Sequence, residues 1–290
     1  MPERVPEGSS PRLREKVSLF GPGATRYAGE SMRGSPDFLL IDISNSYTKV
    51  VPATAGALVG PVRRIATPRL SVAALRRAAG VGRRYRGIIL SSVVPRAEKA
   101  VEAYAALVEG GAERLRRVDH RAALGIAIDY PNPAGIGADR LANAAGAALF
   151  YGAPAVVVDF GTALTFDILA GSPTAPVYCG GVIAPGLEAM THYLHQRTAL
   201  LPKIDLSEPM GVIGRSTRDA MLAGAVYGYR GLVRGILAEL RRELGAAPHV
   251  VATGGYAELI ARQLPEIATV HPNLTLEGLR VIAGRTFPAR

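Results

Sequence analysis

The sequence predicts an α/β protein made of two similar lobes, each a mixed β-sheet with helices packed on it. Apolar, β-branched segments alternate with helical patterns along the chain, which favours this class. One motif also occurs twice: an apolar strand ends in an aspartate, Asp42 or Asp159, and small hydroxylated residues follow. A carboxylate, hydroxyl groups and free backbone N–H groups at such a turn suit the phosphates of a nucleotide and their metal ion.

The chain has 290 residues, of which 48% are hydrophobic, so it can form the cores of two modest lobes. We expect a disordered basic leader over residues 1–36, which are rich in Pro, Gly, Ser and Arg, a first lobe over residues 37–152 and a second lobe over residues 153–290. No apolar run approaches the ~20 residues of a membrane-spanning helix, and residues 1–36 lack the apolar centre of a secretory signal. We therefore expect a soluble cytoplasmic protein with no membrane partner.

The net charge of +10 comes largely from one stretch, since eight arginines and no acids lie between Arg63 and Arg86. Residues 71–79 within it have the pattern of an amphipathic helix whose arginines face the solvent. No zinc finger, RNA-recognition motif or basic helix followed by heptads is present. The sequence therefore does not favour nucleic acid as a partner.

In the first lobe, the hydrophobic pattern predicts strands over residues 38–43, 48–52 and 58–65, then a helix over 71–80 and a strand over 87–94. A helix follows over 96–109, and another begins near Gly137 and runs to Phe150.

The second lobe begins in the same way, with a strand over 155–160, its hairpin partner over 164–169 and a further strand over 177–183. Ser216 and Asp219 form a capping pattern that opens a long helix, which Gly245 ends, and residues 248–253 form the next strand.

Three motifs resemble the signature motifs of the type III pantothenate kinase family. They are Asp-Ile-Ser-Asn-Ser-Tyr-Thr-Lys at 42–49, the segment from Tyr130 to Gly-Ala-Asp-Arg at 137–140, and Asp-Phe-Gly-Thr-Ala-Leu-Thr at 159–165. The resemblance implies the actin-like kinase superfamily, with two ribonuclease-H-like lobes. It also implies an enzyme, a phosphotransferase with an alcohol group as acceptor, that uses ATP to phosphorylate pantothenate to 4'-phosphopantothenate, the first step of coenzyme A biosynthesis.

The resemblance further implies the cofactors, partners and site residues. ATP would bind with Mg²⁺, held by Asp42 directly or through water, and Asp159 would bind a monovalent cation, K⁺ or NH₄⁺. Asp139 would be the catalytic base, and a homodimer would bind pantothenate at its interface. The implied ATP-binding residues are Asp42, Ile43, Ser44, Asn45, Ser46, Tyr47, Thr48, Lys49 and Thr162. The implied substrate-binding residues are Tyr130, Gly137, Ala138, Asp139, Arg140 and Thr217.

Each motif taken alone also has a purely structural explanation. The turn after Asp42 is of a common type, and its hydroxyl groups, including those of Ser44, Ser46 and Thr48, are as typical of turns as of phosphate sites. An acid such as Asp139 stabilises a helix start, and Thr217 suits a helix cap. We expect the helix N-terminus and Arg140 to lower the pKa of Asp139, which would make it a weak base.

Two residues depart from the family pattern, because Ser44 stands where glycine is usual and Tyr47 where a small polar residue is usual. A Cβ at position 44 would hinder the approach of the backbone to a phosphate. Together with the basic leader, this departure leaves an alternative: a catalytically impaired relative that binds or regulates. Since Asp42, Asp139 and Asp159 are all retained, the sequence favours the kinase.

Overall fold

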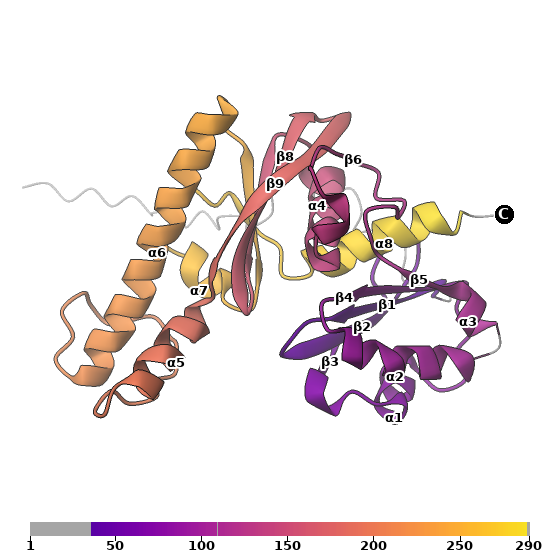
Figure 1. Cartoon of the computed structure of the whole chain (residues 1–290), viewed down its shortest axis with the longest axis horizontal. Helices are drawn as coiled ribbons and strands as arrows, with labels where there is room; N and C mark the ends of the chain where they lie inside the picture. Colours follow the sequence, from indigo (N-terminus) through magenta and orange to yellow (C-terminus); the bar gives the residue numbers. More distant parts are fainter. Residues whose placement is uncertain (1–35, 109, 289–290) are drawn as a thin grey trace, which may run out of the picture.

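Two β-sheets, each covered by helices, form the framework of the two lobes in the computed structural model (Figure 1). The structure describes residues 36–108 and 110–288. The predicted leader, apart from residue 36, lies outside the described residues. The predicted α/β class with two mixed sheets is confirmed.

The first sheet has the strand order β3-β2-β1-β4-β5, in which β1 is antiparallel to β2 and parallel to β4. Its strands are β1 (Phe38–Ile43), β2 (Tyr47–Ala53), β3 (Arg63–Ala66), β4 (Gly87–Ser92) and β5 (Leu115–Arg117). The helical segments of this lobe are η2 (Thr67–Arg69), α1 (Val72–Ala79), α2 (Pro95–Ala106) and α3 (Gly111–Arg114). Helices α1 and α2 lie beneath the sheet in Figure 1, next to each other.

The second sheet has the order β11-β10-β7-β8-β9-β6, with an antiparallel ladder from β7 to β9 and β10 parallel to β7. Its strands are β6 (Ala127–Ile128), β7 (Ala155–Phe160), β8 (Ala163–Ser172), β9 (Ala175–Pro185), β10 (His249–Gly254) and β11 (Thr269–Val270). The helices on its outer side are α5 (Leu187–Arg197), α6 (Thr217–Leu244) and α7 (Ala257–Ala261).

Two helices, α4 (Ala138–Tyr151) and α8 (Leu274–Thr286), pack against each other between the sheets (Figure 1). Because strand side chains alternate between faces, Phe38 and Leu40 of β1 join a core with α4 and α8, whereas Leu39 and Ile41 face the other side. In the second sheet, Val157 joins the same core. One hydrophobic core therefore connects the inner faces of both sheets.

The predicted elements are present with shifted ends. The strand expected over 58–65 covers only Arg63–Ala66, and Leu58 forms an isolated bridge with Ala53. The strand expected over 87–94 ends at Ser92, because proline at position 95 starts α2. The long helix begins and ends as predicted, with the Ser216 hydroxyl accepting from the Asp219 N–H at 3.1 Å and Gly245 in the left-handed conformation.

Two elements connect the halves of the chain. Strand β6, which precedes residue 152, pairs with β9 of the second sheet, and α8, at the end of the chain, packs on β1 and β4 of the first sheet. These two elements therefore cross the lobe boundary predicted between residues 152 and 153, and the boundary itself stays a prediction. None of the described helices is both long and apolar enough to cross a membrane.

Candidate active site

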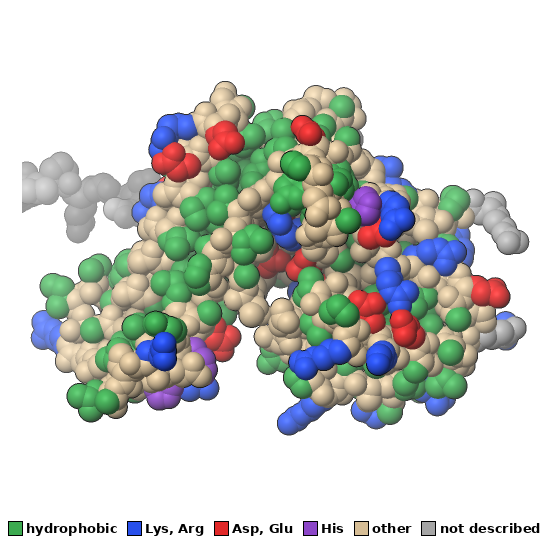
Figure 2. All heavy atoms as spheres, viewed as in Figure 1, with side chains coloured by type: hydrophobic (Ala, Val, Ile, Leu, Met, Phe, Trp, Pro, Cys, Tyr) green, Lys and Arg blue, Asp and Glu red, His purple; other side chains and the backbone are tan. Residues whose placement is uncertain are grey.

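The two aspartate-ended strands meet between the lobes. Asp42 continues the inner face of β1, and Asp159 continues the inner face of β7, so strand alternation directs both carboxylates toward α4 and α8. Asp139 lies in the first turn of α4. Negative charge on Asp139 and Asp159 helps to raise the pKa of Asp42, as expected for neighbouring carboxylates. Figure 2 shows acidic side chains in the hollow between the lobes.

The turns themselves also touch. The Ser46 hydroxyl, after β1, lies 3.4 Å from the Thr162 hydroxyl, after β7, and both residues are exposed. This contact joins positions 116 residues apart in the sequence. The two predicted phosphate turns thus form opposite sides of one opening.

Asp42 is held within its own sheet. Its carboxylate accepts a hydrogen bond from the Ser91 hydroxyl at 3.0 Å and a longer one from the Ser44 hydroxyl at 3.4 Å, and Lys49 is its cross-strand partner on β2. Burial raises the pKa of Asp42 to about 6, although Lys49 acts in the opposite direction. The positive charge of Lys49 therefore does not fully offset the effect of burial on the Asp42 carboxyl group.

Asp159 is held by the central helices instead. It accepts from the Asn143 amide of α4 at 3.1 Å, and the Asn143 oxygen accepts from the Thr275 hydroxyl of α8 at 2.8 Å. Burial is the main cause that raises the pKa of Asp159. Gly254 lies directly beside it at φ +94°, where a Cβ would come within 2.5 Å of the carboxylate. Glycine is required here both for the conformation and for the space.

A buried hydroxyl group lies next to Asp159 on the neighbouring strand. Thr253 of β10 is in register with Asp159 and is 1% exposed. Its Oγ1 has no hydrogen-bond partner among the described residues. A buried hydroxyl group without a partner is uncommon in proteins, and a bound ion or water molecule is one explanation for it.

Asp139 differs from the expectation in its ionisation. The N–H of Arg140 donates to its carboxylate at 2.8 Å, which lowers the pKa as predicted. Burial between the lobes raises the pKa by more, so the overall shift is upward and the prediction of a weak base is wrong in direction. The helix start was visible in the sequence, but the loss of solvent was not.

The side chain of Arg140 turns away from Asp139 toward Asp167 of β8. Its Nε donates to Asp167 Oδ1 at 2.7 Å, and the Tyr178 hydroxyl donates to the same oxygen at 3.2 Å. Burial raises the pKa of Asp167 to about 7 despite Arg140. Sequence reasoning missed Asp167, although its place between buried Phe166 and Ile168 put it on the inner face of β8.

The ATP-binding stretch predicted over residues 42–49 is only partly accessible. Asn45, Ser46 and Tyr47 are exposed at the turn, whereas Ile43 is completely buried in the core. Thr48 is also completely buried, and its hydroxyl lies 3.1 Å from that of Thr67. In this structure the Thr48 hydroxyl therefore faces Thr67 and not the opening, and the role of Thr48 in ATP binding stays a prediction.

Thr67 braces this turn from η2. Its hydroxyl donates to the Ser44 carbonyl at 2.7 Å, and its N–H donates to the Ser46 carbonyl at 3.0 Å. No described non-glycine residue has a positive φ, so Ser44 has a conformation that any L-residue adopts. The serine at this position therefore strains no backbone, and it does not by itself imply an impaired site.

The predicted substrate residues fall into two groups. Gly137, Ala138 and Arg140 surround Asp139 at the start of α4, and the ring of Tyr130 packs edge-on against Tyr178 near Arg140, with 6.3 Å between the ring centroids. Thr217 is separate from them. It is exposed at the start of α6, at the lower left of Figure 1, away from α4.

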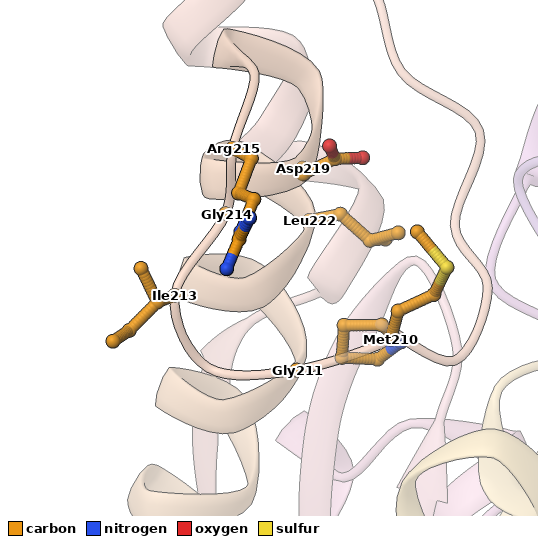
Figure 3. A pocket seen from close by; sticks show the side chains of 8 residues that line it. Met210, Gly211, Ile213, Gly214, Arg215, Asp219 and Leu222 are labelled. Carbon is orange, nitrogen blue, oxygen red and sulfur yellow. The ribbon is translucent and has the colours of Figure 1, made fainter.

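A shallow pocket of about 240 Å³ lies beside the start of α6 (Figure 3). Leu222 of α6 and Met210 of the preceding loop point toward each other across it, and Ile213 points away from the helix. Met210 is 100% exposed and Ile213 is 87% exposed. This surface lies outside the acidic opening between the lobes.

The acidic residues fit a metal ion that arrives with a nucleotide. In residues 36–108 and 110–288, no group of three or more His, Cys, Asp or Glu side chains is arranged to hold a metal. Mg²⁺ bound to ATP needs only one or two protein carboxylates, since phosphates and water complete its shell. Asp42 can supply such a carboxylate, because the positive charge of Lys49 offsets only part of the effect of burial on it.

Solved structures share the two-lobed arrangement. A "putative 2-dehydro-3-deoxygalactonokinase protein" from Sinorhizobium meliloti aligns with a TM-score of 0.55 and 16% identity over 87% of this chain and 98% of its own. A "conserved putative Baf family transcriptional activator" from Campylobacter jejuni aligns with a TM-score of 0.52 and 18% identity over 84% and 96%. The chain therefore has the two-lobed fold of these structures, with acidic side chains facing each other between the lobes.

Sequence comparison gives the family. The type III pantothenate kinase family matches residues 38–239. A type III pantothenate kinase from Akkermansia muciniphila is 51% identical over 252 residues, covering 85% of this chain and 98% of that protein. One from Methylacidiphilum infernorum is 44% identical over 248 residues, covering 84% and 87%. The chain belongs to the type III pantothenate kinase family, which confirms the resemblance seen in its motifs.

Proposed function

We propose that this chain transfers the γ-phosphoryl group of ATP to a hydroxyl group of pantothenate, producing 4'-phosphopantothenate and ADP in the first step of coenzyme A biosynthesis. The observation that carries this proposal is the meeting of Asp42, Asp139 and Asp159 between the lobes of a chain of this family. Because ATP is supplied in the cytoplasm, the proposal retains the predicted cytoplasmic location.

The nucleotide end of the reaction is assigned to the two facing turns. The exposed Asn45, Ser46 and Thr162 offer polar groups to the phosphates, and Asp42 would hold Mg²⁺ directly or through water. When it is bound with ATP, magnesium neutralises charge on the phosphate oxygens. Lys49, opposite Asp42, adds positive charge on the same face of the sheet.

The acceptor end is assigned to the start of α4. The hydroxyl oxygen of pantothenate attacks the γ-phosphorus, the bond to the β–γ bridging oxygen breaks, and ADP leaves. The hydroxyl proton passes to the Asp139 carboxylate, which the N–H of Arg140 orients at 2.8 Å. Because burial raises the pKa of Asp139, it is a stronger base than an exposed aspartate.

A monovalent cation is proposed at Asp159. The support is a carboxylate with a pKa raised by burial and the adjacent, unpartnered hydroxyl of Thr253. Oxygen donors of this kind suit a hard cation. K⁺ or NH₄⁺ bound there would add positive charge on the second-lobe side of the opening.

A homodimer is proposed to complete the acceptor site. Thr217 makes no contact in the described chain that would bring it to Asp139, yet the motif resemblance predicts that it binds substrate. Exposed apolar side chains lie in the loop before it, as at subunit interfaces: Leu200, Met210, Val212 and Ile213. Sedimentation of Ile213→Asp against the wild type tests this: the variant should be monomeric with a raised KM for pantothenate, and an unchanged dimer would contradict the proposed interface.

The activity itself is tested with a coupled assay for ADP release from the full-length chain. ATP, Mg²⁺ and K⁺ are present, and pantothenate is added or omitted. We expect pantothenate-dependent ADP release that falls by about 10²–10⁴-fold in Asp139→Asn, the usual contribution of a general base. Exchange of K⁺ for Na⁺ should reduce the rate through the Asp159 site. A folded protein without pantothenate-dependent turnover would refute the kinase and favour the impaired relative.

A further inference from the structure

We propose that Asp167 is a positioning residue for the acceptor, because it fixes the Arg140 guanidinium and, through Tyr178, the ring of Tyr130. This inference rests on the proposed function, in which Arg140 and Tyr130 contact pantothenate. Asp167 itself lies behind them on β8 and is 0% exposed.

The contacts of Asp167 converge on one oxygen. Arg140 Nε donates to Oδ1 at 2.7 Å and the Tyr178 hydroxyl donates to it at 3.2 Å. Tyr178 stays neutral and able to donate, since burial raises its pKa. One carboxylate oxygen therefore fixes the orientation of both a guanidinium and a phenol.

Arg140 and Asp167 do not form the most stable geometry of a buried ion pair. A bidentate pair would use two oxygens and two nitrogens. Here Asp167 Oδ2 and Arg140 Nη2 are both buried and have no hydrogen-bond partner among the described residues. Because buried unpaired polar atoms are costly, this arrangement is better explained by the position that it gives Arg140 than by stability.

The neighbouring strand is shaped to this guanidinium. A Cβ at Gly181 of β9 would collide with Arg140 Nη2 and with the Phe166 carbonyl. The backbone of β9 therefore passes directly against Arg140, and Asp167 and Gly181 together leave its side chain one place to lie. Arg140 lies 5.8 Å from the Tyr178 ring centroid, and that ring packs edge-on against Tyr130.

The base is oriented by a different group of Arg140. Asp139 accepts from the Arg140 backbone N–H at 2.8 Å, which α4 holds in place, whereas Asp167 accepts from the Arg140 side chain. Asp167 thus acts on the acceptor through Arg140 and Tyr178 and touches neither the proposed phosphates nor the turn at Ser46. Its loss should affect pantothenate far more than ATP.

The test compares Asp167→Asn with the wild type in the full-length chain, measuring KM for each substrate. We expect KM for pantothenate to rise about tenfold, as for residues that support a ligand contact, with KM for ATP within about twofold. Tyr178→Phe keeps the ring and removes only the hydroxyl, and it should raise the same KM by about threefold. This second variant keeps the test decisive if Asp167→Asn does not fold.

A double variant separates positioning from a general structural effect. If Asp167 acts through Arg140, Asp167→Asn should add little to the loss already caused by Arg140→Gln, because coupled residues are not additive. Glu266→Gln is the matched control, since Glu266 pairs with Arg234 Nε at the same 2.7 Å but lies outside the site, and its KM values should not change.

Three outcomes would each overturn the role of Asp167. They are equal changes in the KM values for pantothenate and ATP, additive losses in the double variant, and wild-type behaviour of both Tyr178→Phe and Asp167→Asn. A wild-type protein without pantothenate-dependent turnover would overturn the proposed function as well. The two failures are therefore distinguished by the wild-type assay alone.

Discussion

The two aspartate-ended strands have the same local pattern, but the structure anchors their carboxylates differently. Asp42 is bonded within the first sheet by Ser91, whereas Asp159 is bonded to Asn143 of α4 and through it to α8. Asp139 lies on the same helix as Asn143, in the first turn of α4. Two similar strand-end motifs can therefore hold one carboxylate by its own sheet and the other by the helices between the lobes.

This difference has a consequence for closure of the opening. Asp139 and Asp159 share the support of α4, while Asp42 meets them across the gap that Ser46 and Thr162 bridge at 3.4 Å. A relative motion of the lobes would change the distance from Asp42 to Asp139 and Asp159. It would change the distance between Asp139 and Asp159 less. The nucleotide side and the acceptor side would then be brought together by lobe closure.

The largest effect expected for the two compared acids concerns the ion that each of them binds. Asp42→Asn should raise the Mg²⁺ concentration for half-maximal activity, and Asp159→Asn should raise that for K⁺, each by about tenfold or more. Titration of each ion at saturating levels of the other measures both. If the two variants changed the same ion requirement equally, the proposed division between the turns would be wrong.

The packing around Asp159 is tested by a pair of neighbouring glycines. Gly254→Ala introduces a Cβ within 2.5 Å of the Asp159 carboxylate at φ +94°, whereas a Cβ at Gly255 meets nothing within 4 Å. We expect Gly254→Ala to lower the free energy of unfolding by about 1–3 kcal/mol. Gly255→Ala should change it by less than about 0.5 kcal/mol. Urea denaturation measures both, and equal effects would contradict the close approach.

A pH series tests the ionisation of Asp42. Its pKa is raised from 3.8 to about 6, so the folded state favours the protonated form, and this stabilisation is present below pH 4 and lost as the pH rises through 6. In ligand-free protein, Asp42→Asn should therefore gain stability relative to the wild type as the pH rises from about 4 to 6, by at most about 3 kcal/mol. ATP with Mg²⁺ should remove this gain. A pH-independent difference would contradict the shift.

The smallest effect on activity is expected at Ser44, which stands where the family usually has glycine. Ser44→Gly restores the usual glycine, but Ser44 has no positive φ to relieve, and its hydrogen bond to Asp42 is long at 3.4 Å. We expect KM for ATP within about twofold of the wild type and a stability loss of about 0.5–1 kcal/mol from backbone entropy. A large gain in ATP affinity would mean that the serine obstructs the nucleotide.

Local patterns predicted the parts of the site that end strands or begin helices. Asp42 and Asp159 close apolar strands, and Ser216 caps α6, so these features follow from neighbours in the sequence. Asp167 was missed because its role depends on Arg140, 27 residues away, and on burial by a different element. The alternation of side chains along a strand predicts which face a residue lies on, but not which distant residue it contacts.

The ionisation of Asp139 shows the same limit. The helix N-terminus and Arg140 were visible in the sequence and do lower its pKa, but burial between the lobes exceeds them. The hydroxyl of Thr48 was assigned from its place in a turn, whereas the fold turns it inward to Thr67. In both cases tertiary packing, and not local sequence, decides which groups meet solvent.

The exchange of β6 and α8 between the halves sets an order for folding during synthesis. The inner face of the first sheet, with Phe38, Leu40 and Ile89, packs in a core that includes Leu279 and Ile282 of α8. These α8 residues are translated long after the strands that they cover, so the first lobe keeps an apolar face uncovered until residues 274–286 have been made. The first lobe is thus expected to complete its core only when the second lobe has also been synthesised.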